Sequence, residues 1–122
     1  MYSRKLYHRN IFWLNHFDIE SKQLLLSVER VSNHLFEHIE RRHDISVQSL
    51  LNIVQGLYTK DIRPFEVEVD DNNKVVKMAI RVSYDKYRDI SIVIREGFIV
   101  TYWFNDKTDR HKTLDKSKYE KC

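Results

Sequence analysis

The spacing of apolar residues changes once along the chain, and this change limits the folds that it can adopt. Between residues 28 and 54 apolar side chains recur every three or four positions, and from residue 65 onward they recur every second position. The first spacing is typical of a helix with one buried face, and the second of a strand with one buried face. The sequence therefore predicts an α+β fold in which helices precede a sheet.

Two helices are expected in the first part of this pattern. One is predicted over 28–42, with Ser27 as its N-cap. The other is predicted over 47–56, with Ser46 as its N-cap and Gly56 as its C-terminal stop. The apolar stripes behind these predictions are Val28, Val31, Leu35 and Ile39 in the first helix, and Val47, Leu50, Leu51 and Val54 in the second.

Four short strands are expected in the second part, joined by connections of hairpin length. The alternation predicts strands over 65–69, 76–82, 90–94 and 98–105, which form a four-stranded antiparallel meander. An antiparallel sheet usually has one covered face, so the N-terminal helices are expected to pack on one face of this meander.

The last hairpin has two alternative registers. A two-residue loop at 96–97 would mix polar and apolar side chains on both faces, whereas a three-residue loop at 95–97 opposes Ile94 to Phe98 and Ile92 to Val100. We expect the second register, with Gly97 in a left-handed conformation. Its apolar face would carry Ile90, Ile92, Ile94, Phe98, Val100, Tyr102 and Phe104, and its other face Ser91, Val93, Ile99, Thr101, Trp103 and Asn105.

Length and composition indicate a single domain over 1–122. Within it we expect an N-terminal arm or short helix at 1–22, a helical pair at 23–57, an antiparallel sheet at 64–105 and a polar tail at 106–122. No apolar run approaches the roughly 18 residues that a membrane helix needs, so no membrane segment is expected. The one cysteine, Cys122, allows no internal disulfide, which favours a cytoplasmic protein. Two glycines are too few for a phosphate loop or a dinucleotide fingerprint.

The charge balance is weak evidence by itself. The chain has 21 Lys+Arg and 18 Asp+Glu, and a net charge of +3 does not require a nucleic-acid partner. The location of the charges is more informative, because Lys77 and Arg81 are expected on the same sheet face as Trp103. That face is predicted to be a groove in which Trp103 stacks on a base while the two cations meet phosphate. The alternative is that the apolar cluster around Trp13 covers this face.

The segment after Asn105 is almost wholly polar and contains His111. A histidine has a pKa suited to proton transfer, and cations stabilise charge on a phosphate, so the chain could cleave RNA without a metal through attack by the 2′-hydroxyl. His34 and His38 have a spacing compatible with zinc, but we expect neither a metal nor another cofactor. The candidate catalytic residues are His111, Arg81, Thr101 and His38, and the candidate RNA-binding residues are Trp103, Asn105, Lys77, Arg42 and Lys112.

Two parts of the chain carry a resemblance to known proteins. The strings Val100-Thr101-Tyr102-Trp103-Phe104-Asn105 and Asp109-x-His111-x-Thr113-Leu114-Asp115-x-Ser117-x-Tyr119 resemble C-terminal segments of small phage proteins and toxin-like domains. Upstream, Glu29-Arg30, Arg41-Arg42 and Ile45-Ser46 are similar to the helical opening of such toxins. With the order of elements, these segments resemble the metal-independent ribonuclease fold of barnase, the RelE toxins and EndoU-type toxins. The resemblance implies a toxin-like RNA hydrolase, with a neutralising protein as a further partner.

A non-enzymatic function is the alternative hypothesis. The same basic and aromatic face could dock RNA or a target protein without cutting anything, as in a phage-encoded inhibitor of a host defence system of the anti-CRISPR type. A plain interaction domain that uses the Trp13 cluster remains a third possibility. Cleavage of RNA in the presence of EDTA distinguishes the enzyme from both.

Overall fold

The computed structural model describes residues 5–8, 18–58, 64–72 and 74–108. The Trp13 cluster, His111 and Lys112 lie outside these ranges. The helices are α2 (Asp18–Ser27), α3 (Asn33–Arg42) and α4 (Val47–Leu57). The strands are β1 (Lys5–His8), β2 (Arg30–Val31), β3 (Glu66–Val69), β4 (Val75–Ser83), β5 (Arg88–Arg95) and β6 (Phe98–Asp106).

The protein is α+β, and its sheet is larger than the sequence predicts. The strand order is β1-β3-β4-β5-β6-β2. The four consecutive strands β3 to β6 are antiparallel neighbours, in the order expected for the meander. Strand β1 adds to one edge in antiparallel orientation, and β2 adds to the other edge parallel to β6. The prediction of a purely antiparallel four-stranded sheet is therefore wrong at both edges.

The first predicted helix begins later than its apolar stripe suggested. Residues 30–31 form β2, and the N-cap of α3 is Ser32, whose hydroxyl accepts a hydrogen bond from the backbone N–H of Leu35 at 3.2 Å. Ser27, the predicted cap, instead ends the additional helix α2, and its hydroxyl accepts a hydrogen bond from the Gly97 N–H at 3.0 Å. The stripe residues Val28 and Val31 are buried as expected, but they are not helical.

The second predicted helix agrees closely with α4. Ser46 is its N-cap, and the hydroxyl accepts a hydrogen bond from the Ser49 N–H at 3.1 Å. Gly56 does not end the helix, because α4 continues to Leu57 and is followed by Tyr58. In the described part of the chain, every helix is too short or too polar to cross a membrane.

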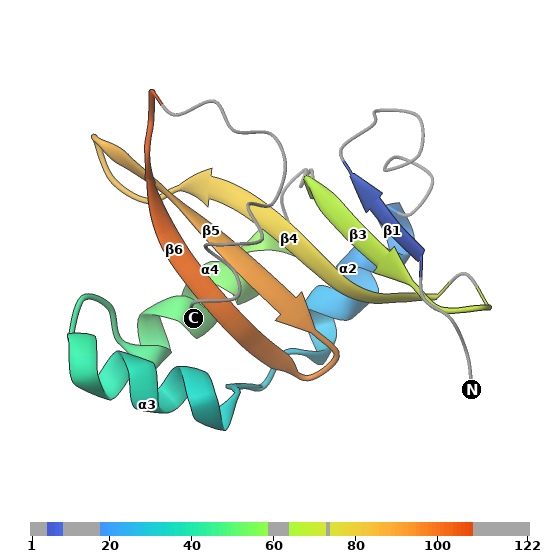
Figure 1. The fold of residues 1–122 in the computed structure, drawn as a ribbon, viewed down its shortest axis with the longest axis horizontal. Helices are drawn as coiled ribbons and strands as arrows, with labels where there is room; N and C mark the ends of the chain where they lie inside the picture. Colours follow the sequence, from blue (N-terminus) through green and yellow to red (C-terminus); the bar gives the residue numbers. More distant parts are fainter. Residues whose placement is uncertain (1–4, 9–17, 59–63, 73, 109–122) are drawn as a thin grey trace.

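The helices cover one face of the sheet. Helix α2 packs on β4 and β5, α3 packs on β6, and α4 packs on β2 and α2. Figure 1 shows α2 and α4 behind the sheet, with α3 beside the edge at β6. Between these layers lies an apolar core whose fully buried members include Leu25, Leu35, Leu50, Val54, Val67, Met78, Ile80, Ile90, Ile92, Ile94 and Ile99.

A β-bulge decides which side chains of β6 face the helices. The β5–β6 loop has two residues, and Arg95 pairs with Phe98. The register then shifts between Val93 and Ile94, so that Ile94 pairs with Ile99 and Val93 with Thr101, with Val100 as the extra residue. The expected three-residue loop is therefore wrong, although Gly97 does adopt a positive φ of 85°. After the bulge the predicted faces are correct: Tyr102 and Phe104 pack on the core under the helices.

Candidate functional site

The sheet face away from the helices, called the second face here, is closed at its middle. It carries Ala79 from β4, Val93 from β5 and Thr101 from β6, and their exposed fractions are 2%, 1% and 3%. Phe65 packs with Ala79 and Val93, and the half-buried Trp103 packs against this cluster. The predicted catalytic role of Thr101 is therefore wrong in this structure, because RNA cannot reach a side chain buried to this degree. The ring of Trp103 is only half-buried, so the stacking of a base on it stays a prediction.

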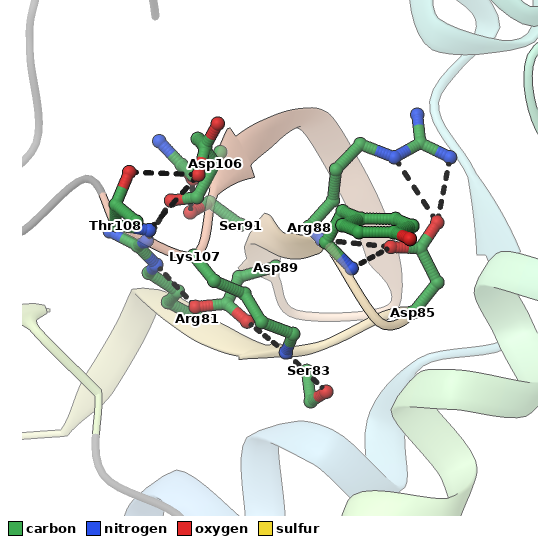
Figure 2. A network of polar contacts seen from close by, with 11 residues as sticks. Arg81, Ser83, Asp85, Arg88, Asp89, Ser91, Asp106, Lys107 and Thr108 are labelled. Carbon is green, nitrogen blue, oxygen red and sulfur yellow. Dashed lines mark hydrogen bonds and ion pairs between the residues drawn. The ribbon is translucent and has the colours of Figure 1, made fainter.

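The first polar end of the second face lies beside the β4–β5 hairpin (Figure 2). Its centre is Asp89, whose carboxylate accepts hydrogen bonds from Arg81 Nε at 3.0 Å and from Lys107 Nζ at 2.9 Å. Lys107 Nζ also donates to the Ser83 hydroxyl at 2.7 Å, and Arg81 Nη2 donates to the carbonyl of Asp106 at 3.0 Å. We call Arg81, Ser83, Asp89 and Lys107 the hairpin network.

The charges of the hairpin network compensate one another. Burial by itself would raise the pKa of Asp89, but the hydrogen bonds and charges of Lys107 and Arg81 outweigh burial and lower it. The pKa of the neighbouring Asp85 is lowered first by the hydrogen bond from the Tyr87 N–H and further by Arg88. Because Arg81 is committed to Asp89 and to a backbone carbonyl, its position is explained by the fold without a ligand.

The second polar end lies beside the β5–β6 turn. Strand pairing places Lys77 beside Arg95, Arg95 beside Phe98, and Phe98 beside Arg30. In-register neighbours share a face, so these four residues form a row of about 14 Å across four strands of the second face. Glu68 of β3 pairs with Lys77 and lies beside that end of the row. The guanidinium of Arg30 lies 4.6 Å from the centre of the Phe98 ring. We call Lys77, Arg95, Phe98 and Arg30 the basic row.

A groove accompanies the basic row. It has a volume of about 330 Å³ and is lined by Arg30, Ser32, Asn33, Arg95, Phe98 and Val100. Arg30 and Arg95 are exposed, and neither has a carboxylate within ion-pair distance among the residues that the structure describes. Two guanidinium groups beside an aromatic ring suit an anion attached to a planar group.

Two further candidates, His38 and Arg42, lie on the helix-covered side. The ring of His38 is edge-on to Tyr102, with 6.1 Å between the ring centres. The Tyr102 hydroxyl donates a hydrogen bond to Asp44, and Arg42 Nε lies 3.7 Å from the same carboxylate. The pKa of His38 is lowered, first by burial and then by the charges of Arg42 and Arg41. Tyr102 separates His38 from the second face, so His38 cannot share a site with Arg81.

The predicted residues thus fall into separate groups. Lys77, Arg81, Thr101, Trp103 and Asn105 share the second face, as expected, but Thr101 and Asn105 are buried and Arg81 lies at the opposite end from Lys77. Asn105 accepts a hydrogen bond from the Ser91 hydroxyl at 2.6 Å. His111 and Lys112 lie outside the described residues. In the described ranges, no group of three or more His, Cys, Asp or Glu side chains could hold a metal ion.

Sequence reasoning missed Arg30, Arg95 and Phe98. Arg30 was assigned to a helix, Arg95 to a loop, and Phe98 to the helix-covered face. The missing information is the parallel pairing of β2 with β6 together with the bulge, which turns Phe98 toward the second face. The sequence signal for this end was Arg95, a basic residue directly before the β5–β6 turn. Compared with family models, curated proteins and solved structures, the chain matches none.

Proposed function

We propose that the protein binds single-stranded RNA and that the basic row is its phosphate contact. The observation that carries this proposal is the row itself, in which Arg30 and Arg95 flank Phe98 beside a groove and have no carboxylate partner among the described side chains. Paired arginines favour phosphate, and an aromatic ring between them favours a base, which together are typical of single-strand binding.

Cleavage of the bound RNA is a second candidate function. It is favoured by the order of elements, since helices precede four consecutive antiparallel strands as the resemblance to small ribonucleases implies. In this reaction the 2′-oxygen would attack the adjacent phosphorus and the bond to the 5′-oxygen would break. The 2′-hydroxyl gives up its proton to a base and the leaving oxygen gains one from an acid, which leaves a 2′,3′-cyclic phosphate and a 5′-hydroxyl. His111 is the candidate proton-transfer group for this reaction.

The test of binding uses a labelled mixed-sequence single-stranded RNA and titrations at several salt concentrations. We expect wild-type affinity to fall as salt rises, and each of Arg30→Gln and Arg95→Gln to reduce the slope of log K against log salt by about 0.7. Arg41→Gln is the matched control, because Arg41 is exposed on α3 and belongs to no part of the row. The proposal is wrong if the wild type does not bind, or if the control lowers affinity as much as the row variants do.

The test of cleavage adds EDTA to the same RNA and analyses the product ends. Products with 2′,3′-cyclic ends that disappear in His111→Ala would support the ribonuclease. RNA that stays intact while it is bound would support the non-enzymatic module, including an inhibitor that blocks a host system. Cleavage that is equally fast in His111→Ala would remove His111 from the mechanism.

A further inference from the structure

The β4–β5 turn presents an aromatic side chain to solvent. Tyr87 has an exposed fraction of 70%, larger than that of Leu26, Phe36 or Tyr58, the other exposed large hydrophobic residues of the described chain. A large exposed ring gains little from the hydrophobic core, so its contribution to the stability of the fold is small. A partner that stacks on the ring would, in contrast, bury most of the ring's exposed surface.

The backbone under Tyr87 is held in place before any partner arrives. The Tyr87 N–H donates to Asp85 Oδ1 at 2.9 Å, and the Tyr87 carbonyl accepts a hydrogen bond from the Lys107 N–H at 3.0 Å. The Arg88 N–H donates to the same Asp85 oxygen at 2.8 Å, and Figure 2 shows the Arg88 guanidinium on the other oxygen of Asp85. Binding at an ordered turn has a lower conformational entropy cost than binding at a loose one.

The charges around the ring favour an anionic partner. Lys86 Nζ lies 5.6 Å from the centre of the Tyr87 ring, and Lys86 has no ion pair among the described residues. Two of the nearby carboxylates are compensated by cations, because Asp85 binds Arg88 and Asp89 binds both Arg81 and Lys107. The third, Asp106, accepts hydrogen bonds from the backbone N–H and the hydroxyl of Thr108. The turn therefore offers one aromatic face and one available cation, the combination that single-stranded nucleic acids recognise.

We propose that Tyr87 is a stacking platform for an unpaired RNA base and that Lys86 contacts the adjacent phosphate. This inference rests on the proposed RNA binding and adds a second contact to it. Arg88 and Arg95 begin and end β5, so the platform lies about 23 Å from the basic row along the strand. Bases in a duplex are already stacked and paired, so the platform gives a preference for single-stranded over double-stranded RNA.

The experiment compares two single-stranded probes with the same length and charge, an RNA oligonucleotide and its abasic counterpart. Tyr87→Ala is expected to weaken binding of the RNA by roughly 5- to 150-fold and to leave binding of the abasic probe and the salt slope unchanged. Tyr87→Phe keeps the ring and should keep the affinity. Tyr58→Ala is the matched control, since Tyr58 is also exposed but follows α4.

The outcomes separate this inference from the proposed function. If Arg30→Gln and Arg95→Gln weaken binding while Tyr87→Ala does not, the stacking platform is wrong and RNA binding stands. If Tyr87→Ala weakens both probes equally, the ring does not recognise a base and the inference is again wrong. If the wild type binds neither probe, the proposed function fails and the platform fails with it. Unfolding of Tyr87→Ala in denaturant, expected to match the wild type, shows that the variant is folded.

Discussion

The two ends of the second face contain the same kinds of cations in different electrostatic settings. In the hairpin network Arg81 and Lys107 share the carboxylate of Asp89, and the pKa of that carboxyl is lowered as a result. In the basic row Arg30 and Arg95 have an aromatic ring between them and no carboxylate partner in the described part of the chain. The comparison shows that an exposed cation indicates a binding surface only where no carboxylate of the protein itself is paired with it.

The middle of the second face keeps these two ends apart. Ala79 and Val93 are buried there with Phe65, and the Thr101 hydroxyl is buried without a hydrogen-bond partner among the described atoms. The ends are therefore expected to respond separately to mutation. Substitution in the hairpin network should change the stability of the fold, whereas substitution in the basic row should change ligand affinity.

The largest effect on stability is expected for Asp89→Asn. The amide cannot accept charge-assisted hydrogen bonds of the same strength from Arg81 and Lys107, and hydrogen bonds to charged groups contribute roughly 1.5–3 kcal/mol. We expect the free energy of unfolding to fall by about 2 kcal/mol, measured by urea denaturation at neutral pH. The matched substitutions Arg30→Gln and Arg95→Gln should change it by less than about 0.5 kcal/mol. Equal losses at both ends would remove the distinction between them.

A smaller effect is expected for Gly97→Ala, beside the basic row. Gly97 has a φ of 85°, which a residue with a Cβ adopts at a cost of roughly 1 kcal/mol. The added Cβ would meet its nearest atom, the carbonyl oxygen of Ser27, at 4.0 Å, so the cost is conformational and not steric. We expect a loss of about 1 kcal/mol in the free energy of unfolding. A loss above that of Asp89→Asn would show that the turn, and not the network, is the more important support of the second face.

Much of the fold follows from local patterns in the sequence. The period of two predicted β3 to β6 because each strand has one face on the core, and Ser46 was identified because a serine before an apolar stripe is a typical cap. The edges of the sheet did not follow from such patterns. Strand β2 is two residues long and pairs in parallel with β6, a contact between distant segments that no local pattern encodes.

The candidate site was less predictable than the fold because it depends on the bulge. One extra residue, Val100, reverses the faces of Phe98 and Ile99 relative to the expected register. The sequence correctly placed Lys77 and Arg81 on one face, but it could not show that Arg81 is paired with Asp89. His38 and Arg42 were grouped with the sheet residues by chemical type alone. In the fold they lie on the helix-covered side of the sheet, where His38 contacts Tyr102 of β6.

The smallest expected effect is a pH dependence of the free energy of unfolding, and we expect it only for the hairpin network. The folded-state pKa of Asp89 is below the ordinary carboxyl value of 3.8, so its contribution to stability is complete above that value and is lost as pH falls through the folded-state pKa. The difference in unfolding free energy between wild type and Asp89→Asn should therefore be constant above about pH 5 and shrink at lower pH.

The difference between wild type and Arg95→Gln should stay flat over the same range, because in the described structure Arg95 has no carboxylate to lose. Urea denaturation of the three proteins at several pH values from neutral to acid measures both differences. An Asp89→Asn difference that persists unchanged in acid would mean that the asparagine acts through packing and not through the lost charge. An Arg95→Gln difference that shrinks in acid would reveal a carboxylate partner for Arg95, and would weaken its assignment as a phosphate contact.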